Sequence, residues 1–400
     1  MNTIHRCLLG IILSSVLFGE NLNLSILTDL VLNQNIAIKS SEKEINIKSS
    51  ELLQSKMFEN PSIEIATGFG NETEVSTMLS QTIPIGRKRR HNIHLHELEL
   101  ERAKIEHTNI QSQKLTEAYM LFVEVLQFQE KRLLLEKQIE VSEELLIAVE
   151  KKVTAGKLST AEISRAKIQL YQEISGFRKI ENTLQIKWKE LETFWSESQP
   201  TFTQGIGNIA TLFDYPSVLS IENSLEYKQA KIQVDIQNTA INLEKSNRIP
   251  DIEIGAGVRQ SDFTDNTLNF GLSIPLPIFN RNKNNINIAK LQLDKSTLDL
   301  SDQSLKIQTK ISNIEHKLKE LKIEIEVLKN DIIPEANSAY LVINNGYLNG
   351  RFTYLDIVDA KKMWFETKNQ ILDALAEYQI EILKLRHISG NINQNLLGEN

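Results

Sequence analysis

Cysteine is nearly absent from this chain. The 400 residues contain one cysteine, Cys7, which lies close to the amino terminus. If the first segment is cleaved on export, the mature chain has no thiol, and both a disulfide framework and a thiolate metal site are excluded. Cys7 also precedes the first apolar run instead of following it, which disfavours a lipid-attachment cysteine.

Glycine and proline are scarce as well. The chain has 16 glycines and 8 prolines, against 41% hydrophobic and 24% charged residues. Such a composition favours long helices over many turns and allows a large core. The net charge is −7, and the basic residues are spread along the chain, so nucleic acid is not expected as a partner.

The first apolar run is too short to span a bilayer as a permanent anchor. It covers residues 8–18, follows His5 and Arg6, and leads to Gly19. A basic start, a short apolar stretch and a small residue are the three parts of a secretory signal. We therefore expect residues 1–19 to be a signal peptide and the mature protein to be exported from the cytoplasm.

One unit of sequence occurs twice. The stretch that starts at Pro61, Pro-Ser-Ile-Glu-Ile-Ala-Thr-Gly-Phe-Gly, has a counterpart at Pro250, Pro-Asp-Ile-Glu-Ile-Gly-Ala-Gly-Val-Arg, 189 residues later. The stretch from Gly156 matches the one from Gly350, 194 residues later, with Gly, Ile, Ala and Lys at the same places. Such self-similarity indicates a duplicated structural unit, and its mixture of strands and long helices favours a conduit.

Each copy contains two segments with period-two alternation. We expect strands at residues 61–70 and 74–85 in the first copy, and at 250–259 and 267–278 in the second. Each is about 10 residues long with one apolar face, as a tilted strand that crosses the hydrocarbon layer requires. Soluble hairpins with one wet face give the same pattern. If the strands do cross a membrane, several chains must share one barrel, because four strands cannot close one.

Long helical segments flank the strands. Helical spacing covers Leu22 to Glu59 and Arg281 to Ile333, and the second stretch corresponds to roughly 80 Å at about 1.5 Å per residue. In that stretch apolar residues form a heptad seam, made of Ile307, Ile311, Ile314, Leu318, Leu321, Ile325, Leu328 and Ile332. A looser seam in the first copy is broken by Arg132 and Ser142. These helices must pack on neighbours along nearly their whole length.

Breaks in the helical pattern define the plan of each copy. The chain turns near 156 in the first copy and near 346–350 in the second, so each copy predicts a helical hairpin whose turn lies far from the strands. The expected units are a first repeat at 20–197, an irregular join at 198–220, a second repeat at 221–390 and a disordered tail at 391–400.

Two basic clusters follow the second strand. His91, His94 and His96 form the densest group of histidines, but no acidic or thiolate partner is evident beside them, so a solvated surface is favoured and no metal is expected. The run from Arg87 to Arg90 lies where the chain leaves the apolar band. It is suited to anionic lipid headgroups, although a solvated helix start explains it nearly as well.

Acidic residues mark two further places. Asp356 and Asp359 lie three apart beside Arg351 and Tyr347, and in an oligomer they would repeat around an axis as a ring that selects cations or gates a passage. Glu64 and Glu253 hold equivalent places in the polar strand faces. No phosphate loop, dinucleotide motif or catalytic triad pattern occurs, so we expect no catalytic residues and no cofactor.

Two segments stand out beside the duplicated plan: Gly-Arg-Phe-Thr-Tyr-Leu-Asp-Ile-Val-Asp-Ala from Gly350, and Ser-Ile-Pro-Leu-Pro-Ile-Phe-Asn-Arg-Asn-Lys-Asn-Asn-Ile from Ser273. With these features the chain resembles the TolC family of outer-membrane efflux proteins over nearly its whole length. The second segment is most similar to the heavy-metal-efflux branch. The resemblance implies a mainly α fold with a small transmembrane β part: a homotrimer with a 12-stranded β-barrel, continued by a long α-helical tunnel across the periplasm.

The resemblance also implies roles for single residues. Tyr347, Asp356 and Asp359 occupy the places of a tyrosine and two aspartates that hold the closed state of a periplasmic gate. The family's gating arginine falls on Phe352, and this chain has its arginine one position earlier, at Arg351, so the latch differs.

The resemblance also implies which residues meet a partner protein and which residues line the lumen of the channel. Gly156 and Gly350 match the turns that meet a periplasmic adaptor protein. Glu64 and Glu253 face the lumen.

The expected function is therefore the passive exit duct of a tripartite pump of the resistance-nodulation-division type, for heavy-metal cations or small toxic compounds. Its partners would be the adaptor, an inner-membrane pump and outer-membrane lipid, and it would lie in the outer membrane and extend into the periplasm. It is not expected to be an enzyme. Two alternatives remain at this stage: the outer-membrane duct of a type I protein secretion system, and a periplasmic coiled-coil scaffold without a pore.

Overall fold

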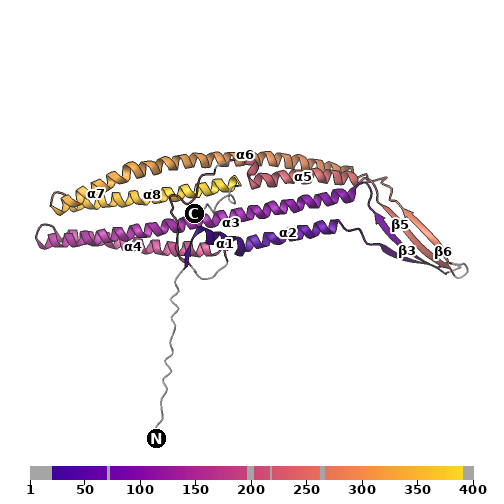
Figure 1. The fold of residues 1–400 in the computed structure, drawn as a ribbon, viewed down its shortest axis with the longest axis horizontal. Coiled ribbons are helices and arrows are strands. Elements are labelled where there is room, and N and C mark those ends of the chain that lie inside the picture. Colours follow the sequence, from indigo (N-terminus) through magenta and orange to yellow (C-terminus); the bar gives the residue numbers. More distant parts are fainter. Residues whose placement is uncertain (1–19, 70–72, 196–201, 217–218, 262–265, 391–400) are drawn as a thin grey trace, which may run out of the picture.

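The chain folds as a rod of helices that ends in a small sheet (Figure 1). The computed structural model describes residues 20–69, 73–195, 202–216, 219–261 and 266–390. The expected signal peptide and carboxy-terminal tail lie outside these residues. Among the helices in the described ranges, none combines the length and the apolar character that a membrane span needs.

Helices make up most of the rod, in the order of the two repeats. The first repeat and the join contain β1 (Glu20–Leu22), α1 (Leu24–Gln34), α2 (Ile36–Ser55), β2 (Ser62–Phe69), β3 (Thr73–Ile83), α3 (Lys88–Thr154), α4 (Thr160–Glu192) and β4 (Phe202–Gly205). The second repeat contains η1 (Ile221–Asn223), α5 (Leu225–Ser246), β5 (Ile252–Ser261), β6 (Thr267–Ser273), α6 (Lys283–Val327), η2 (Leu328–Ile332), α7 (Ile333–Leu348) and α8 (Tyr354–Ile388).

One antiparallel sheet joins the strands of both repeats. Its order is β2-β3-β5-β6, so within the sheet the two repeats meet where β3 pairs with β5. Two strands end earlier than the alternation predicts: β3 stops at Ile83, directly before Pro84, and β6 stops at Ser273, two residues before Pro275. Proline lacks the N–H that a strand ladder needs. The mainly helical fold with a small β part is confirmed.

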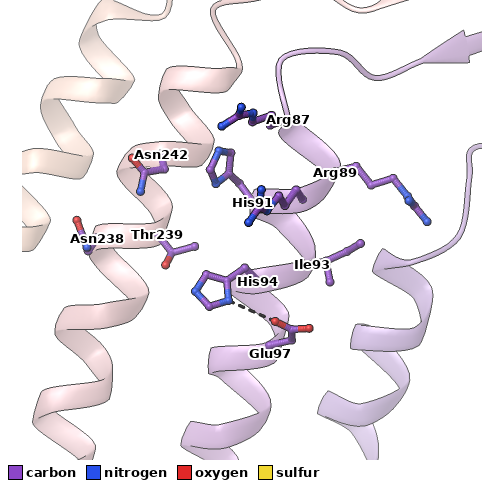
Figure 2. Close-up of a pocket in the computed structure, with 10 residues that line it drawn as sticks. Arg87, Arg89, His91, Ile93, His94, Glu97, Asn238, Thr239 and Asn242 are labelled. Atoms are coloured by element: carbon purple, nitrogen blue, oxygen red, sulfur yellow. Dashed lines mark hydrogen bonds and ion pairs between the residues drawn. The ribbon is translucent and has the colours of Figure 1, made fainter.

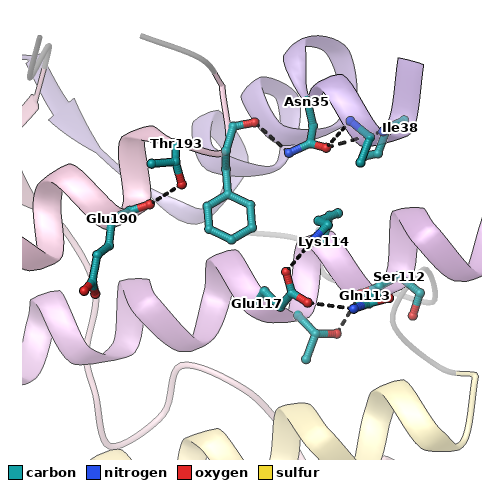
Figure 3. Close-up of polar contacts among 11 residues, drawn as sticks. Asn35, Ile38, Ser112, Gln113, Lys114, Glu117, Glu190 and Thr193 are labelled. Carbon is teal, nitrogen blue, oxygen red and sulfur yellow. Dashed lines mark hydrogen bonds and ion pairs between the residues drawn. The ribbon is translucent and has the colours of Figure 1, made fainter. Parts of the chain in front are cut away.

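A break at Asn35 divides the helical stretch that the spacing predicts as one helix. The Asn35 side-chain oxygen accepts hydrogen bonds from the backbone N–H groups of Ala37 (3.0 Å) and Ile38 (3.3 Å), which caps the start of α2. Its amide nitrogen donates to the carbonyl of Phe194 (3.0 Å), beyond the end of α4 (Figure 3). The expectation of one continuous helix was wrong, because the side chain of Asn35 supplies the bonds that an unbroken backbone would make.

The long helix of the second repeat contains a π-helical turn. Residues Leu328–Ile332 form this turn, directly before Pro334 in the first turn of α7. Proline cannot donate a backbone hydrogen bond, and a wider turn is one way to accommodate the missing bond. The predicted heptad seam is buried at Ile307, Leu321 and Leu328 but has ended by Ile332, which is 40% exposed.

The join between the repeats is more ordered than the expected irregular segment. β4 pairs in parallel with β1 at the start of the chain, with Leu22 opposite Gly205. Aromatic residues after β4 then reach the central core, where the rings of Phe213 and Tyr119 lie 5.5 Å apart. Strand β1 and the described part of the join therefore close over the middle of the rod, where both helical hairpins meet.

Candidate functional site at the helical tip

Two tight turns lie side by side at the end of the rod opposite the sheet (Figure 1). Gly156 (φ +68°) follows α3, and Gly350 (φ +78°) follows α7. Both angles fall in the left-handed region, which glycine adopts without strain and which closes helix ends. Between the turns lies a groove of about 820 Å³, lined by Lys152, Glu162 and residues around Tyr347. The structure thus brings Gly350 and Tyr347 together with the first helical hairpin.

Tyr347 is the centre of the tip. Its side chain is buried, its ring lies edge-on to that of Tyr354 (6.5 Å), and the Lys152 ammonium lies 3.6 Å from the ring centroid. The same ammonium donates to the carbonyl of Tyr347. A lysine that contacts both a ring face and a helix carbonyl holds α7 against α3. Sequence reasoning named Tyr347 but missed Lys152.

The Tyr347 hydroxyl is buried and has no hydrogen-bond partner among the described residues. Burial raises the pKa of this phenol, and the nearby Glu162 carboxylate raises it further. One carboxylate oxygen of Glu162 is likewise buried without a partner in the described part of the chain. Buried polar atoms without hydrogen bonds cost free energy. A ligand that enters the groove with a donor or an acceptor would supply the missing bonds.

Asp356 serves the start of its own helix. Its carboxylate accepts hydrogen bonds from the Thr353 backbone N–H (2.7 Å) and hydroxyl (2.8 Å), and the Thr353 hydroxyl accepts from the Asp356 N–H (3.3 Å). These bonds, the backbone one first, lower the pKa of Asp356. This arrangement is a capping box, so the carboxylate is already occupied in holding the first turn of α8.

Asp359 and Arg351 are the free charges near the second turn. Both side chains are exposed, and neither has an ion pair within the ranges that the structure describes. The ring of Phe352, in the family's arginine position, packs on Gly346, where an added Cβ would lie 2.3 Å from Phe352 Cδ2. The contact at Phe352 is therefore one of an aromatic ring with the backbone of α7, and not a charged one.

A buried ion pair joins the two repeats next to the tip. The Lys361 ammonium of α8 lies 2.8 Å from Glu173 Oε1 of α4, and both side chains are buried. Ser142 of α3 accepts from Lys361 and donates to Glu173, while Gln138 and Gln169 also donate to that carboxylate. Sequence reasoning treated Ser142 as a break in the apolar seam. It is a member of a satisfied polar cluster that three helices share.

At the other end of the rod, the acidic residues Glu64 and Glu253 lie on one face of the sheet. Glu64 pairs with Met78, Glu253 pairs with Thr82, and Met78 and Thr82 are four residues apart on β3. Because side chains alternate along a strand, these positions share the polar face. The opposite face carries the exposed apolar residues of the sheet.

The histidine cluster has an acidic neighbour from another helix, which the sequence did not reveal. Glu51 of α2 lies beside His96 and Glu99 of α3, with one possible ligand atom from each within 4.8 Å of the others. One imidazole and two carboxylates suit a divalent cation, although the Lys48 ammonium, 2.9 Å from Glu51, already supplies a positive charge there. His94 pairs instead with Glu97 (3.3 Å).

Part of the chain matches a known protein family, and most of the chain matches a curated relative. Residues 217–391, which hold the second hairpin and the second half of the sheet, match the family of outer membrane efflux proteins. This part of the chain is therefore similar to outer membrane efflux proteins. A curated relative of the chain is the cobalt-zinc-cadmium resistance protein CzcC of Cupriavidus metallidurans. It is 23% identical over 363 residues, which cover 89% of this chain and 87% of CzcC.

Solved structures share the fold of this chain. CusC superposes with a TM-score of 0.81 at 14% identity, over 92% of each chain. The CmeC outer membrane channel of Campylobacter jejuni gives 0.78 at 15% identity, over 92% of this chain and 85% of that one. The outer membrane protein VceC of Vibrio cholerae gives 0.74 at 14% identity, over 92% and 96%. The family that matches residues 217–391 is one of efflux proteins, which are transport proteins.

Proposed function

We propose that three copies of this chain form the outer-membrane exit duct of a tripartite efflux pump. The exposed apolar face of the sheet is the observation that carries the proposal. On β6, Leu268 is 75% exposed and Phe270 83%, and similar residues line the same side of the other strands. A contiguous apolar face on short alternating strands is suited to lipid, and a soluble scaffold would leave it in water.

The open edges of the sheet support a trimer. In the described part of the chain, β2 and β6 each pair along one edge only. A free edge in lipid leaves backbone groups without partners, so the sheet must be continued by other copies. Three copies of a four-stranded sheet give the 12-stranded barrel that we expect, above the minimum of about 8 strands for a membrane barrel.

The helical tip is the proposed meeting point with an adaptor protein and, through it, an inner-membrane pump. The tip groove lies between the turns at Gly156 and Gly350 and offers Lys152, Glu162 and the unsatisfied Tyr347 hydroxyl. In the trimer, Asp359 and Arg351 would repeat around the axis as the charged ring of a periplasmic gate. The duct itself is passive, and its opening follows adaptor binding.

Metal cations are the proposed cargo. The support is the likeness to a cobalt-zinc-cadmium resistance protein, together with Glu64 and Glu253 on the polar face that would line the barrel. Carboxylates attract cations without selecting one metal. A deletion strain that becomes sensitive to zinc and cobalt salts would support this cargo, whereas a strain that only fails to secrete a protein would favour type I secretion.

Oligomeric mass and conductance test the duct. We expect native mass spectrometry of the detergent-extracted protein to give a trimer and planar bilayers to show a small closed conductance. Asp359→Asn should raise that conductance because it removes the free charge, whereas Asp356→Asn should act through the helix cap. A monomer that leaves membranes on a carbonate wash would contradict the proposal.

A further inference from the structure

A second groove lies at the opposite end of the helices, next to the sheet. It has a volume of about 870 Å³ and lies between the first turns of α3 and the facing part of α5 (Figure 2). Arg87, His91 and His94 point into it from α3, and Asn238 and Asn242 border it from α5.

Positive charge in this groove is only partly compensated. Lys88, next to Arg87, is paired with Asp251 (2.7 Å). Arg89 donates to the Lys56 carbonyl, and its guanidinium lies 4.3 Å from the Phe58 ring.

By contrast, Arg87 and Arg90 are exposed, and neither side chain forms a hydrogen bond or ion pair with any residue that the structure describes. Glu97 is the one acidic residue among those that line the groove, and it is paired with His94 (3.3 Å).

The backbone adds to this positive field. Arg87 is the residue before α3, with φ +66°, and no side chain caps the helix there. The first N–H groups of this helix therefore point toward its start without a side-chain acceptor, and the helix dipole is positive at that end. The pKa of His91 is lowered, first by burial and then by the charges of Arg90 and Arg87. An anion in the groove would offset the repulsion between these positive charges and accept hydrogen bonds from the first N–H groups of α3.

We propose that this groove binds a phosphate-type anion. Arginine guanidinium groups form bidentate bonds to phosphate, and the facing wall of Asn238, Thr239 and Asn242 supplies neutral donors that complete such a site. The groove begins four residues after β3 ends. If the sheet lies in the outer membrane, as the proposed function holds, the anion is within reach of phospholipid headgroups; free phosphate is the other source.

Binding of inorganic phosphate tests the site without reference to transport. The full-length protein in a phosphate-free detergent would be titrated with inorganic phosphate by calorimetry, at an ionic strength held constant with chloride. We expect saturable binding that is at least ten-fold weaker in the double variant Arg87→Gln, Arg90→Gln. The matched control is Arg178→Gln, which removes an exposed arginine of α4 and should leave binding unchanged.

A second variant distinguishes a specific binding site from nonspecific attraction by positive charge. Asn242→Leu keeps every arginine and removes one exposed donor on the facing wall. It should weaken phosphate binding several-fold, whereas general charge attraction predicts no change. Because both arginines and Asn242 are exposed, these variants are expected to fold, and circular dichroism would check this.

The source of the phosphate is resolved by lipid retention. Native mass spectrometry would count phosphatidylglycerol bound to the wild type and to the double arginine variant. Retention that depends on Arg87 and Arg90 assigns the site to a headgroup, and calorimetric binding without lipid retention assigns it to free phosphate. The proposal is overturned if neither probe distinguishes the double variant from wild type. Conductance in bilayers, measured separately, reports on the duct and not on this site.

Discussion

Lys361 of α8 forms a buried ion pair with Glu173 of α4, with 2.8 Å between Nζ and Oε1, and so joins two helices from different repeats. The side chains are 1% and 4% exposed, and Ser142 of α3 bonds to both. A buried charge is tolerated only when it is paired and hydrogen-bonded, so each partner depends on the other. This pair fixes how the second hairpin sits on the first just behind the tip.

Removal of one partner from this pair should be strongly destabilising. Lys361→Met leaves a buried carboxylate without its cation, and we expect a loss of about 3–5 kcal/mol in the free energy of unfolding. The double variant Lys361→Met, Glu173→Leu should lose less than the sum of its two single changes, because no unpaired charge remains. Urea unfolding followed by circular dichroism measures both effects.

The neighbouring lysine provides the matched control. Lys362 forms an exposed pair with Glu366 (3.7 Å), so Lys362→Met should change the free energy of unfolding by about 0.5 kcal/mol or less. Equal losses from Lys361→Met and Lys362→Met would show that burial of the pair has no energetic consequence.

Glycine at two positive-φ turns should differ in its tolerance of a methyl group. At Gly350 an added Cβ meets no atom within 4 Å, so Gly350→Ala should cost only backbone strain, about 1 kcal/mol. At Gly390 the Cβ would lie 2.3 Å from the Asn223 carbonyl oxygen, so Gly390→Ala should cost severalfold more. Thermal unfolding midpoints compare the two, and a larger drop for Gly350→Ala would contradict the described turn geometry.

His387 should make the protein less stable in mild acid. Its Nδ1 lies 2.8 Å from the Ser112 hydroxyl, and burial is the main reason that its pKa is lowered. As the pH falls through about 6.5, the unfolded chain takes up this proton before the folded one does. The free energy of unfolding therefore decreases from about pH 6.5 down to the lower folded-state pKa, and above pH 6.5 the group has no effect.

Substitution of this histidine tests the pH dependence. His387→Gln should flatten the decrease in urea resistance between pH 7 and pH 5, since the proton uptake of the unfolded chain is removed. His316→Gln changes an exposed histidine on α6 and should leave the slope as it is in the wild type. An unaltered slope in His387→Gln would exclude His387 as its source.

Adjacent residues on β6 should respond oppositely to a charge. Phe270 lies on the exposed apolar face, where Phe270→Lys should cost about 2–4 kcal/mol if the strand crosses the hydrocarbon layer. Asn269 lies on the opposite face, as strand alternation requires, and Asn269→Lys should be tolerated. The yield of heat-modifiable trimer in outer-membrane fractions measures insertion, and equal yields would place both faces in water.

The sequence by itself determined the four strands of the antiparallel sheet, the long helices and the duplicated plan. Period-two alternation, as in β6, and seams such as that through Ile307 and Leu321 are local patterns, which one backbone geometry alone satisfies. The break at Asn35 was also open to prediction, because an asparagine before apolar periodic residues is a helix-start signal.

Only the tertiary structure decided the rest. The bond from Lys361 to Glu173 spans 188 residues, and the bond from Lys152 to Tyr347 spans 195. Glu51 reaches His96 from a different helix, and β4 finds β1 at the start of the chain. Local periodicity fixes which face of an element is apolar but not which polar side chains meet across it, because those contacts depend on how the packed helices are placed relative to one another.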